Sequence, residues 1–560
     1  MKILADEKKR AKLFFFLILL LGIAVRIFRF GQIPCGINQD EAMAAMDAKA
    51  LLSYGTDRLG MKLPVHFTAW GWAQMSVLLS YLMVPCIALF GFTTVAVRLP
   101  MLLISIAGMV FFYLLVKEIL GEKTALLLFF LTAINPWHIL QSRWSLDCNL
   151  FPHLFVIGAY LLLTGIKKRR RLFLSMVFFG LCLYCYGVSV YSVPLFLFVL
   201  ALYLWRTGQV PLYQIFLAGV LFGLVALPEL LTMFLNLVGL PSIETPLFTI
   251  PYFSGTVRSK DILLTSFSIR QLFINLFYTL KAALLQTPDL FHNTIPAFGT
   301  MYHFSILFLP FGIYRLFTSF KKETDASADL TVRTGLLLLA AWFFMGVWVG
   351  LITKEVNVNR INIIHYPCIL LTALGILTAA ERFPKLYRPV LTVFSILFLL
   401  FIGTYFTSYA AQSREEYHED YLKAMRAADS LPIDYLYIST DEHPQTMEIL
   451  LQYALQTDAL YYQQKTCLNN GKEYLPYSER YRFCYLAGDT LDWEQRRTAY
   501  LVTEQEWQHL NDTLYTIYDY GRYRLYVYKG ASTARSAPTV PPTVCQPPAG
   551  KLQSNIHSPV

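Results

Sequence analysis

Long apolar runs recur through the first 407 of the chain's 560 residues, and they constrain the fold more than any other feature. A helix needs about 20 mainly apolar residues to cross the hydrocarbon core of a bilayer. The runs that reach or approach this length are residues 13–30, 72–90, 98–117, 124–140, 150–166, 172–190, 192–205, 211–234, 301–319, 334–352, 361–380 and 388–407. This pattern predicts a polytopic α-helical membrane protein embedded in the lipid bilayer.

Composition excludes an ordinary soluble enzyme. Hydrophobic residues make up 56% of the chain and charged residues 15%, whereas soluble domains carry about 25% charged residues. The net charge of +10 could suggest a nucleic-acid partner. However, the basic residues form short clusters between the apolar runs, as they do in the cytoplasmic loops of membrane proteins. We therefore interpret the charge as a topology signal and expect no nucleic acid.

The basic clusters predict the orientation of the chain. They lie at residues 8–12, 117–123, 167–171, 206, 315–333 and 382–388, and all should be cytoplasmic. All of these clusters can be cytoplasmic only if one apolar run before Lys117 does not cross the membrane. The run 72–90 contains Trp72, Gln74 and Pro85, which is typical of a helix lying in the interface. About eleven spans of the usual length then remain. The N-terminus is predicted to be cytoplasmic, and the compact loops favour a bacterial plasma membrane.

Apolarity falls after residue 407. Residues 408–530 alternate β-like runs ("YLYIST", "YRFCYLAG", "TAYLVT", "YRLYVYK") with the helical pattern "HPQTMEILLQYALQT". They predict a small extracytoplasmic α/β domain that follows the transmembrane domain, residues 1–407. Cys467 and Cys484 fall in it and could form a disulfide. Residues 531–560 are rich in Pro, Ser and Thr and are predicted to be disordered.

Two acidic positions stand at the predicted outer face. Asp40 and Glu41 follow the first apolar run, and Asp147 lies between two later runs, four residues after Arg143. On a helical turn Arg143 and Asp147 would share a face. A loop carboxylate such as Asp40 is usually just solvated, but an acid near lipid is costly and usually functional, which makes Asp147 the stronger candidate.

An ordered set of short motifs covers roughly residues 10–400. The first outer loop opens with Asp40-Glu41, and the further motifs are "KLP" at 62–64, "RLP" at 98–100, "SRWSLD" at 142–147 and "NRINIIHYP" at 359–367. In this order and spacing the set resembles the GT-C glycosyltransferases of family 39, which include protein O-mannosyltransferases and lipid A aminoarabinose transferases. Each motif alone is weak evidence, and the ordered set is stronger.

The resemblance implies a glycosyltransferase that moves a sugar from a polyprenyl-phosphate donor to a hydroxyl acceptor on the extracytoplasmic face. The acceptor could be a protein, a glycolipid or a cell-wall polymer. By this resemblance Asp40 is the general base of an inverting displacement, and Glu41 assists or orients it. Asp147 is a second acid that holds the acceptor or the sugar. Such chemistry requires a carboxylate within hydrogen-bond reach of the acceptor hydroxyl.

The resemblance also implies a set of donor phosphate-binding residues: Lys62, Arg143, Arg360, His365 and Tyr366. Cations there would stabilise the charge of the leaving phosphate. Lys62 could instead be a snorkelling interfacial lysine, and His365 a satisfied interfacial histidine. Possible site-lining residues are Asp289, His292 and Asn293. For these three we favour the alternative of a polar capped turn.

One departure from the aminoarabinose transferases concerns a metal. Their motif has a metal-linked Glu before the lysine, whereas Met61 occupies that place here. We therefore expect no required metal or other cofactor, although a divalent ion remains an alternative. The rival function is a lipid or sugar transporter or flippase, but such proteins usually show internal repeats and polar residues near the bilayer midplane. A family member that only binds or senses is a third alternative.

Overall fold

The computed structural model describes most of the chain. The described residues are 2–69, 73–253, 268–322, 330–439, 444–461, 463, 478, 480–483, 497–503, 510 and 513–529. The chain forms two compact units: unit 1 comprises Met1–Pro34, Asp47–Asp57 and Met61–Ala410, and unit 2 comprises Cys35–Met46, Arg58–Gly60 and Ala411–Val560. The sequence placed the division at 407/408 and assigned the whole first loop to the transmembrane domain, whereas two pieces of that loop belong to unit 2.

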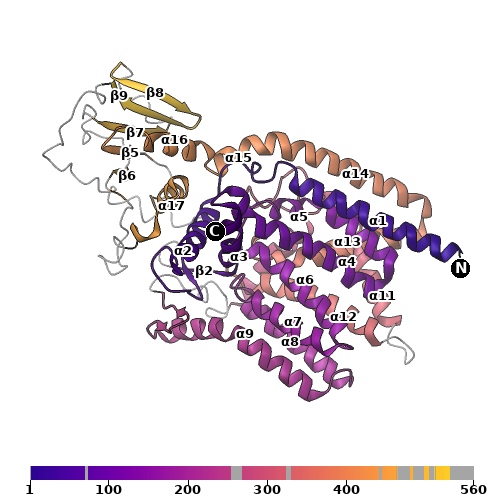
Figure 1. Cartoon of the computed structure of the whole chain (residues 1–560). Helices are drawn as coiled ribbons and strands as arrows, with labels where there is room; N and C mark the ends of the chain where they lie inside the picture. Colours follow the sequence, from indigo (N-terminus) through magenta and orange to yellow (C-terminus); the bar gives the residue numbers. More distant parts are fainter. Residues whose placement is uncertain are drawn as a thin grey trace. The chain divides into compact units, whose positions relative to one another are not determined.

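Unit 1 is built from helices (Figure 1). Its first half contains α1 (Lys2–Ile27), α3 (Leu78–Phe90), α4 (Thr94–Ala133), α5 (Pro136–Gln141), α6 (Asp147–Gly165), α7 (Arg169–Cys182), α8 (Ser189–Arg206) and α9 (Leu212–Val238). Its second half contains α10 (Ile269–Leu284), η4 (His303–Leu307), α11 (Leu309–Lys322), α12 (Leu330–Ile352), η5 (Asn362–Ile364), α13 (His365–Arg382), η6 (Pro384–Leu386), α14 (Tyr387–Thr404) and η7 (Tyr405–Tyr409). Helix α4 packs against α1 and α6, and α6 packs against α7.

Short strand pairs and one shared helix complete the connections of unit 1. Strand β1 (Phe67–Thr68) pairs with β2 (Gln74–Met75), and β3 (Ile243–Glu244) pairs with β4 (Thr249–Ile250), both antiparallel. Helix α2 (Gln39–Tyr54) begins in unit 2 and ends in unit 1.

Seven helices within the described residues are long and apolar enough to cross a membrane: 94–133, 147–165, 189–206, 212–238, 330–352, 362–382 and 384–416. The predicted number was about eleven. Two predicted runs form the single element α4, in which Gly121, at φ 82°, interrupts the helical backbone. Two others fall on α7 and α11, which have 14 residues each. Helix α3 has 13 residues, in keeping with its removal from the predicted spans.

The surface of unit 1 is apolar where a bilayer would cover it. Phe216 and Leu224 on α9 are 68% and 63% exposed, and Leu399 on α14 is 66% exposed. Helix α10 is arranged with its polar side inward, because Asn275 is buried and donates to the carbonyl oxygen of Leu351 at 2.9 Å. Lipid tails solvate exposed apolar side chains, whereas buried polar groups need partners inside the protein. A polytopic membrane fold is thereby confirmed.

Unit 2 contains one five-stranded sheet. Its strands are β5 (Tyr435–Ile438), β6 (Tyr481–Phe483), β7 (Thr498–Thr503), β8 (Tyr515–Tyr520) and β9 (Tyr523–Tyr528), in the order β6-β5-β7-β9-β8. The pairs of β5 with β6 and β7 are parallel, and those of β9 with β7 and β8 are antiparallel. Its helices are α15 (Ala410–Glu416), α16 (Glu419–Asp429) and α17 (Pro444–Leu455).

The predicted strands of the C-terminal domain are confirmed as β5, β6, β7 and β9, and its predicted helix is α17. Strand β8 was not among the predicted strands. Tyrosines dominate the sheet core, where Tyr437, Tyr500, Tyr515 and Tyr526 are buried together. Cys467, Cys484 and the tail 531–560 lie outside the described residues, so the disulfide and the disorder stay predictions.

Candidate functional site

The predicted catalytic acids Asp40 and Glu41 lie in the first turn of α2, within unit 2. The Asn38 side-chain oxygen accepts a hydrogen bond from the Asp40 N–H at 2.9 Å, and Glu41 Oε2 accepts one from the Asn38 N–H at 3.2 Å. This reciprocal pair is a capping box, which fixes the start of a helix. Glu41 is fully buried and Asp40 is half-buried. Glu41 thus caps the helix, and Asp40 lies beside the partial positive charge of its N-terminus, which favours a carboxylate.

Lys62 lies in unit 1, in the short segment that leads into β1. Its Nζ donates to the carbonyl oxygen of Pro246 at 2.6 Å, and its side chain is exposed. Within the described residues this carbonyl is the one acceptor recorded for the Lys62 ammonium group. Because an ammonium group has three N–H donors, two can turn toward a ligand.

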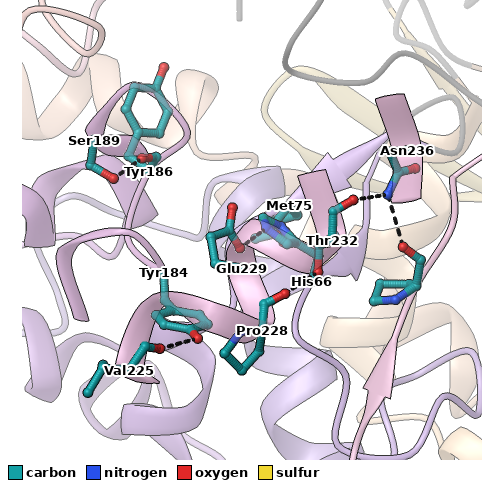
Figure 2. A network of polar contacts seen from close by, with 11 residues as sticks. His66, Met75, Tyr184, Tyr186, Ser189, Val225, Pro228, Glu229, Thr232 and Asn236 are labelled. Atoms are coloured by element: carbon teal, nitrogen blue, oxygen red, sulfur yellow. Dashed lines mark hydrogen bonds and ion pairs between the residues drawn. The ribbon is translucent and has the colours of Figure 1, made fainter. Parts of the chain in front are cut away.

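A buried ion pair that the sequence analysis missed lies four residues after Lys62. His66 Nε2 is 2.5 Å from Glu229 Oε2, and His66 Nδ1 is 3.1 Å from the Met75 carbonyl oxygen (Figure 2). His66 is 4% exposed and Glu229 is 2% exposed. Glu229 had a usable signal, since it is an acid inside the apolar run 211–234, where ionisable residues are usually functional. His66 carried no comparable signal.

The surroundings of this pair are also polar. The hydroxyl of Tyr184 donates to the Val225 carbonyl oxygen at 2.7 Å, and Asn236 bridges the carbonyl oxygens of Thr232 and Pro251 (Figure 2). Burial and the negative charge of Glu229 raise the pKa of Tyr184, so its hydroxyl stays protonated. The C-terminal half of α9 is therefore tied by hydrogen bonds to its neighbours.

Arg143 is fully buried in this structure. It lies between α5 and α6, not on a helical turn shared with Asp147. Its guanidinium donates to six acceptors: the carbonyl oxygens of Val25, Arg26, Phe28, Arg29 and Ile33, and the hydroxyl of Tyr405. A guanidinium has five N–H donors. These acceptors therefore use them all, and Arg143 holds the end of α1. Its role in phosphate binding stays a prediction.

Asp147 is the first residue of α6 and is 6% exposed. Its Oδ1 accepts a hydrogen bond from the Cys148 N–H at 2.7 Å. Close by, the Asn362 side chain donates to Asn149 Oδ1 at 3.1 Å and accepts from the Trp137 indole at 2.7 Å. The carboxylate thus lies at a helix N-terminus, where negative charge is favoured.

His365 and Tyr366 are fully buried, so in this structure neither reaches a phosphate at the surface. The Tyr366 hydroxyl lies between His138 Nε2, at 3.0 Å, and His153 Nδ1, at 2.8 Å. Arg26 extends this series of hydrogen bonds, because its Nη2 is 2.8 Å from His138 Nδ1. Since arginine can only donate, Nδ1 of His138 accepts, its Nε2 donates to Tyr366, and Tyr366 donates to His153.

We call Arg26, His138, Tyr366 and His153 the buried relay; it joins α1, α5, α13 and α6. Burial, together with the charge of Arg26, lowers the pKa of His138 well below its ordinary value, which agrees with a neutral ring. Tyr366 therefore links helices, and its place in the phosphate site stays a prediction. His365 packs its ring against Trp137, with centroids 4.8 Å apart.

The remaining predicted residues lie in two loops. Asp289 Oδ1 accepts from the Leu290 N–H and from the Asn293 side chain, and its Oδ2 accepts from the Val358 N–H at 2.6 Å. These bonds form the polar capped turn that we favoured. His292 packs against Trp144, and burial lowers its pKa to about 4. Arg360 donates to the Glu355 carbonyl oxygen at 2.9 Å.

No group of three or more His, Cys, Asp or Glu side chains in the described part of the chain could hold a metal ion. Asp57, near Met61, uses its Oδ1 to accept a hydrogen bond from the Met61 N–H at 2.8 Å. Metal dependence stays an untested expectation. Cys182 and Cys185 have C-x-x-C spacing, and both are buried free thiols, as suits packing residues.

Comparisons with known proteins agree with this architecture. Residues 75–231 match the profile of the family described as dolichyl-phosphate-mannose-protein mannosyltransferase. ArnT from Cupriavidus metallidurans in the apo state is similar in structure, with a TM-score of 0.55 and 13% identity, over 95% of this chain and 100% of that chain. The same protein bound to undecaprenyl phosphate gives a TM-score of 0.51 and 12% identity, over 92% and 97%.

No curated protein sequence is significantly similar to the chain. At these identities the structural likeness shows the fold. The chain has the expected GT-C type of fold, a polytopic membrane fold with a small C-terminal sheet domain.

Proposed function

We propose that the chain is a membrane glycosyltransferase that moves a sugar from a polyprenyl-phosphate-linked donor to a hydroxyl acceptor. The observation that carries the proposal is the likeness of nearly the whole chain to ArnT, of which one structure holds undecaprenyl phosphate. The profile match at residues 75–231, to a family named for a dolichyl-phosphate sugar donor, supports the same donor class. Fold alone does not define activity, so the site residues must be tested.

Asp40 is the proposed general base. Its carboxylate takes the proton of the acceptor hydroxyl while that oxygen forms a bond to the anomeric carbon of the sugar. The bond from this carbon to the phosphate oxygen breaks, polyprenyl phosphate leaves, and the anomeric configuration inverts. The half-buried position of Asp40 at the start of α2 supports this role, because the capping box holds its backbone in place.

Lys62 is the proposed cation for the donor phosphate, and Asp147 the proposed second acid for acceptor or sugar. The exposed ammonium group of Lys62 supports the first assignment. A cation near the leaving phosphate would stabilise the charge that develops there. Arg360 stays a proposed phosphate ligand. The reaction is proposed to take place on the extracytoplasmic face of a bacterial plasma membrane, with the N-terminus in the cytoplasm.

The decisive experiment measures sugar release from radiolabelled polyprenyl-phosphate mannose, glucose and aminoarabinose by the purified full-length protein in detergent with alcohol acceptors. The wild type should consume one of the donors. Asp40→Asn should lose at least about 100-fold in turnover while it keeps donor affinity, because the base acts on the acceptor. Asp458→Asn, at an exposed aspartate of unit 2, is the matched control and should behave as the wild type.

Turnover in detergent also separates an enzyme from a transporter or flippase, because no gradient exists there. If all donors bind and none is consumed, the transferase proposal fails. Undiminished turnover in Asp40→Asn would leave the transferase in place and remove its proposed base. A chelator arm tests the metal: activity lost with chelator and restored by a divalent ion would overturn the expectation of a metal-free reaction.

A further inference from the structure

The pair of His66 and Glu229 joins two parts of unit 1 that lie 163 residues apart in the sequence. His66 comes from the segment before β1, and Glu229 from the C-terminal half of α9. Both side chains are almost completely buried. Figure 2 shows them approaching each other beside Met75. Ionisable residues are rarely buried to this degree unless they are paired. The pair therefore needs an explanation beyond the solvation of a surface charge.

Hydrogen bonding restricts the protonation of this pair. A carbonyl oxygen can only accept, so the contact with Met75 places a proton on His66 Nδ1. His66 Nε2 and Glu229 Oε2, which are 2.5 Å apart, then share one proton. Whether the proton belongs to the imidazole or to the carboxyl group, the pair has no net charge. Loss of one partner would leave the other buried and unpaired, which is unfavourable.

The segment that carries His66 is fixed along its whole length by its neighbours. The Val65 N–H donates to the Thr249 carbonyl oxygen at 3.0 Å, and the Tyr81 hydroxyl donates to the Pro64 carbonyl oxygen at 3.0 Å. Val65 also packs in a buried apolar cluster with residues of α9 and β4. Lys62 lies at the exposed end of this same segment. The position of its ammonium group therefore depends on how firmly residues 64–66 are held.

We propose that His66 and Glu229 are a positioning pair that holds residues 62–66 against α9 and so fixes Lys62 for the donor phosphate. This inference rests on the proposed function. The burial of both side chains argues that they act through Lys62 and do not touch the substrate. A rigidly held cation binds an anion better than one on a mobile segment, because less freedom is lost on binding.

The test uses full-length protein in detergent and undecaprenyl phosphate as the probe, with binding measured separately from turnover. Lys62→Met should weaken binding at least about tenfold, as expected for loss of a charge-assisted contact. Glu229→Ala should weaken it similarly. Glu229→Gln should stay within about threefold of wild type, because its amide can donate to Nε2 of a neutral His66 and leaves no buried charge. Glu244→Ala, at an exposed residue of β3, is the matched control and should not change binding.

The double variant Lys62→Met/Glu229→Ala distinguishes positioning from general damage. If Glu229 acts only through Lys62, the double variant should bind within about twofold of Lys62→Met alone, because coupled residues are not additive. Additive losses, or wild-type binding by Glu229→Ala, would overturn the proposal. Amide exchange gives a readout that does not depend on the ligand: residues 62–68 should exchange faster in Glu229→Ala and not in Glu244→Ala.

The two readouts separate this inference from the proposed function. If the wild type does not bind undecaprenyl phosphate, the donor class fails and the role of Lys62 fails with it. Amide exchange at residues 62–68 then still decides whether Glu229 holds this segment in place. If the wild type binds the probe but exchange at 62–68 is the same in Glu229→Ala and wild type, the positioning pair is overturned and the proposed function stands.

Discussion

Arg143 shows how much a single buried side chain can hold together. Its six acceptors include five carbonyl oxygens at the end of α1 and just beyond it, and its guanidinium lies over the rings of Tyr405 and Phe406. Arg143→Met should lower the free energy of unfolding by about 3 kcal/mol or more, because several buried carbonyl groups lose their donor. Arg143→Lys should recover part of the loss, since lysine keeps the positive charge but lacks the planar guanidinium with its five N–H donors.

Thermal unfolding of the detergent-solubilised variants measures these losses, and binding of undecaprenyl phosphate to the folded fraction is the control. We expect unchanged affinity in that fraction. A variant with wild-type stability and markedly weaker binding would support Arg143 as a phosphate ligand and contradict a purely structural role.

Tyr366 is the middle link of the buried relay, and its hydroxyl is the testable atom. Tyr366→Phe keeps the ring but leaves His138 Nε2–H and His153 Nδ1 without their partner. We expect a loss of about 1–3 kcal/mol in the free energy of unfolding, the usual cost of buried unpaired polar groups. Tyr203→Phe is the matched control, because the Tyr203 hydroxyl has no partner within the described residues. Equal unfolding temperatures for the two variants would contradict a structural role of the relay.

At the scale of elements, the start of α2 couples helix formation to the proposed base. Asn38→Ala removes the cap and should destabilise the first turn by about 1 kcal/mol. Amide exchange at residues 42–46 should become faster, and turnover should fall while donor affinity stays unchanged, because Asp40 loses its fixed position. Asn38→Asp, which can still cap, should restore both. If turnover falls equally in Asn38→Asp, the cap does not explain the effect.

The positions of helices and strands were more predictable from the sequence than the burial of individual side chains. Alternating patterns located β5, β7 and β9, and apolar runs located the long helices, because both signals are local in the chain. The site residues depend on distant partners. Nothing in the sequence near Tyr366 shows that two histidines from other helices enclose its hydroxyl. Glu229 is the exception, since an acid in an apolar run is a local signal that was available and was not used.

At the scale of the whole molecule, residues 35–60 contribute to both units, which a linear division at residue 407 cannot represent. Each unit also contains a half-buried histidine with a lowered pKa. His292 in unit 1 and His418 in unit 2 both have a pKa lowered to about 4, chiefly by burial. An experiment on the effect of pH must therefore measure the amide exchange of each unit separately, using backbone amides that lie only in that unit.

His418 makes a prediction for unit 2. Burial and the charge of Arg522 lower its pKa to about 4, whereas an unfolded histidine has a pKa of about 6.5. Between these values the unfolded state binds more protons, so the free energy of unfolding decreases as the pH falls from 6.5 to 4. Exchange of the β8 and β9 amides, corrected for the intrinsic effect of pH, should therefore accelerate over this interval in the full-length protein.

The control variant must respect the backbone, because His418 has φ 53° and ψ 31° at the start of α16. Asn adopts this left-handed conformation more readily than most residues and does not titrate. His418→Asn should therefore keep the fold at neutral pH and lose most of the acceleration between pH 6.5 and 4. If both proteins respond equally, the acceleration does not come from His418, and another titrating group controls the acid stability of unit 2.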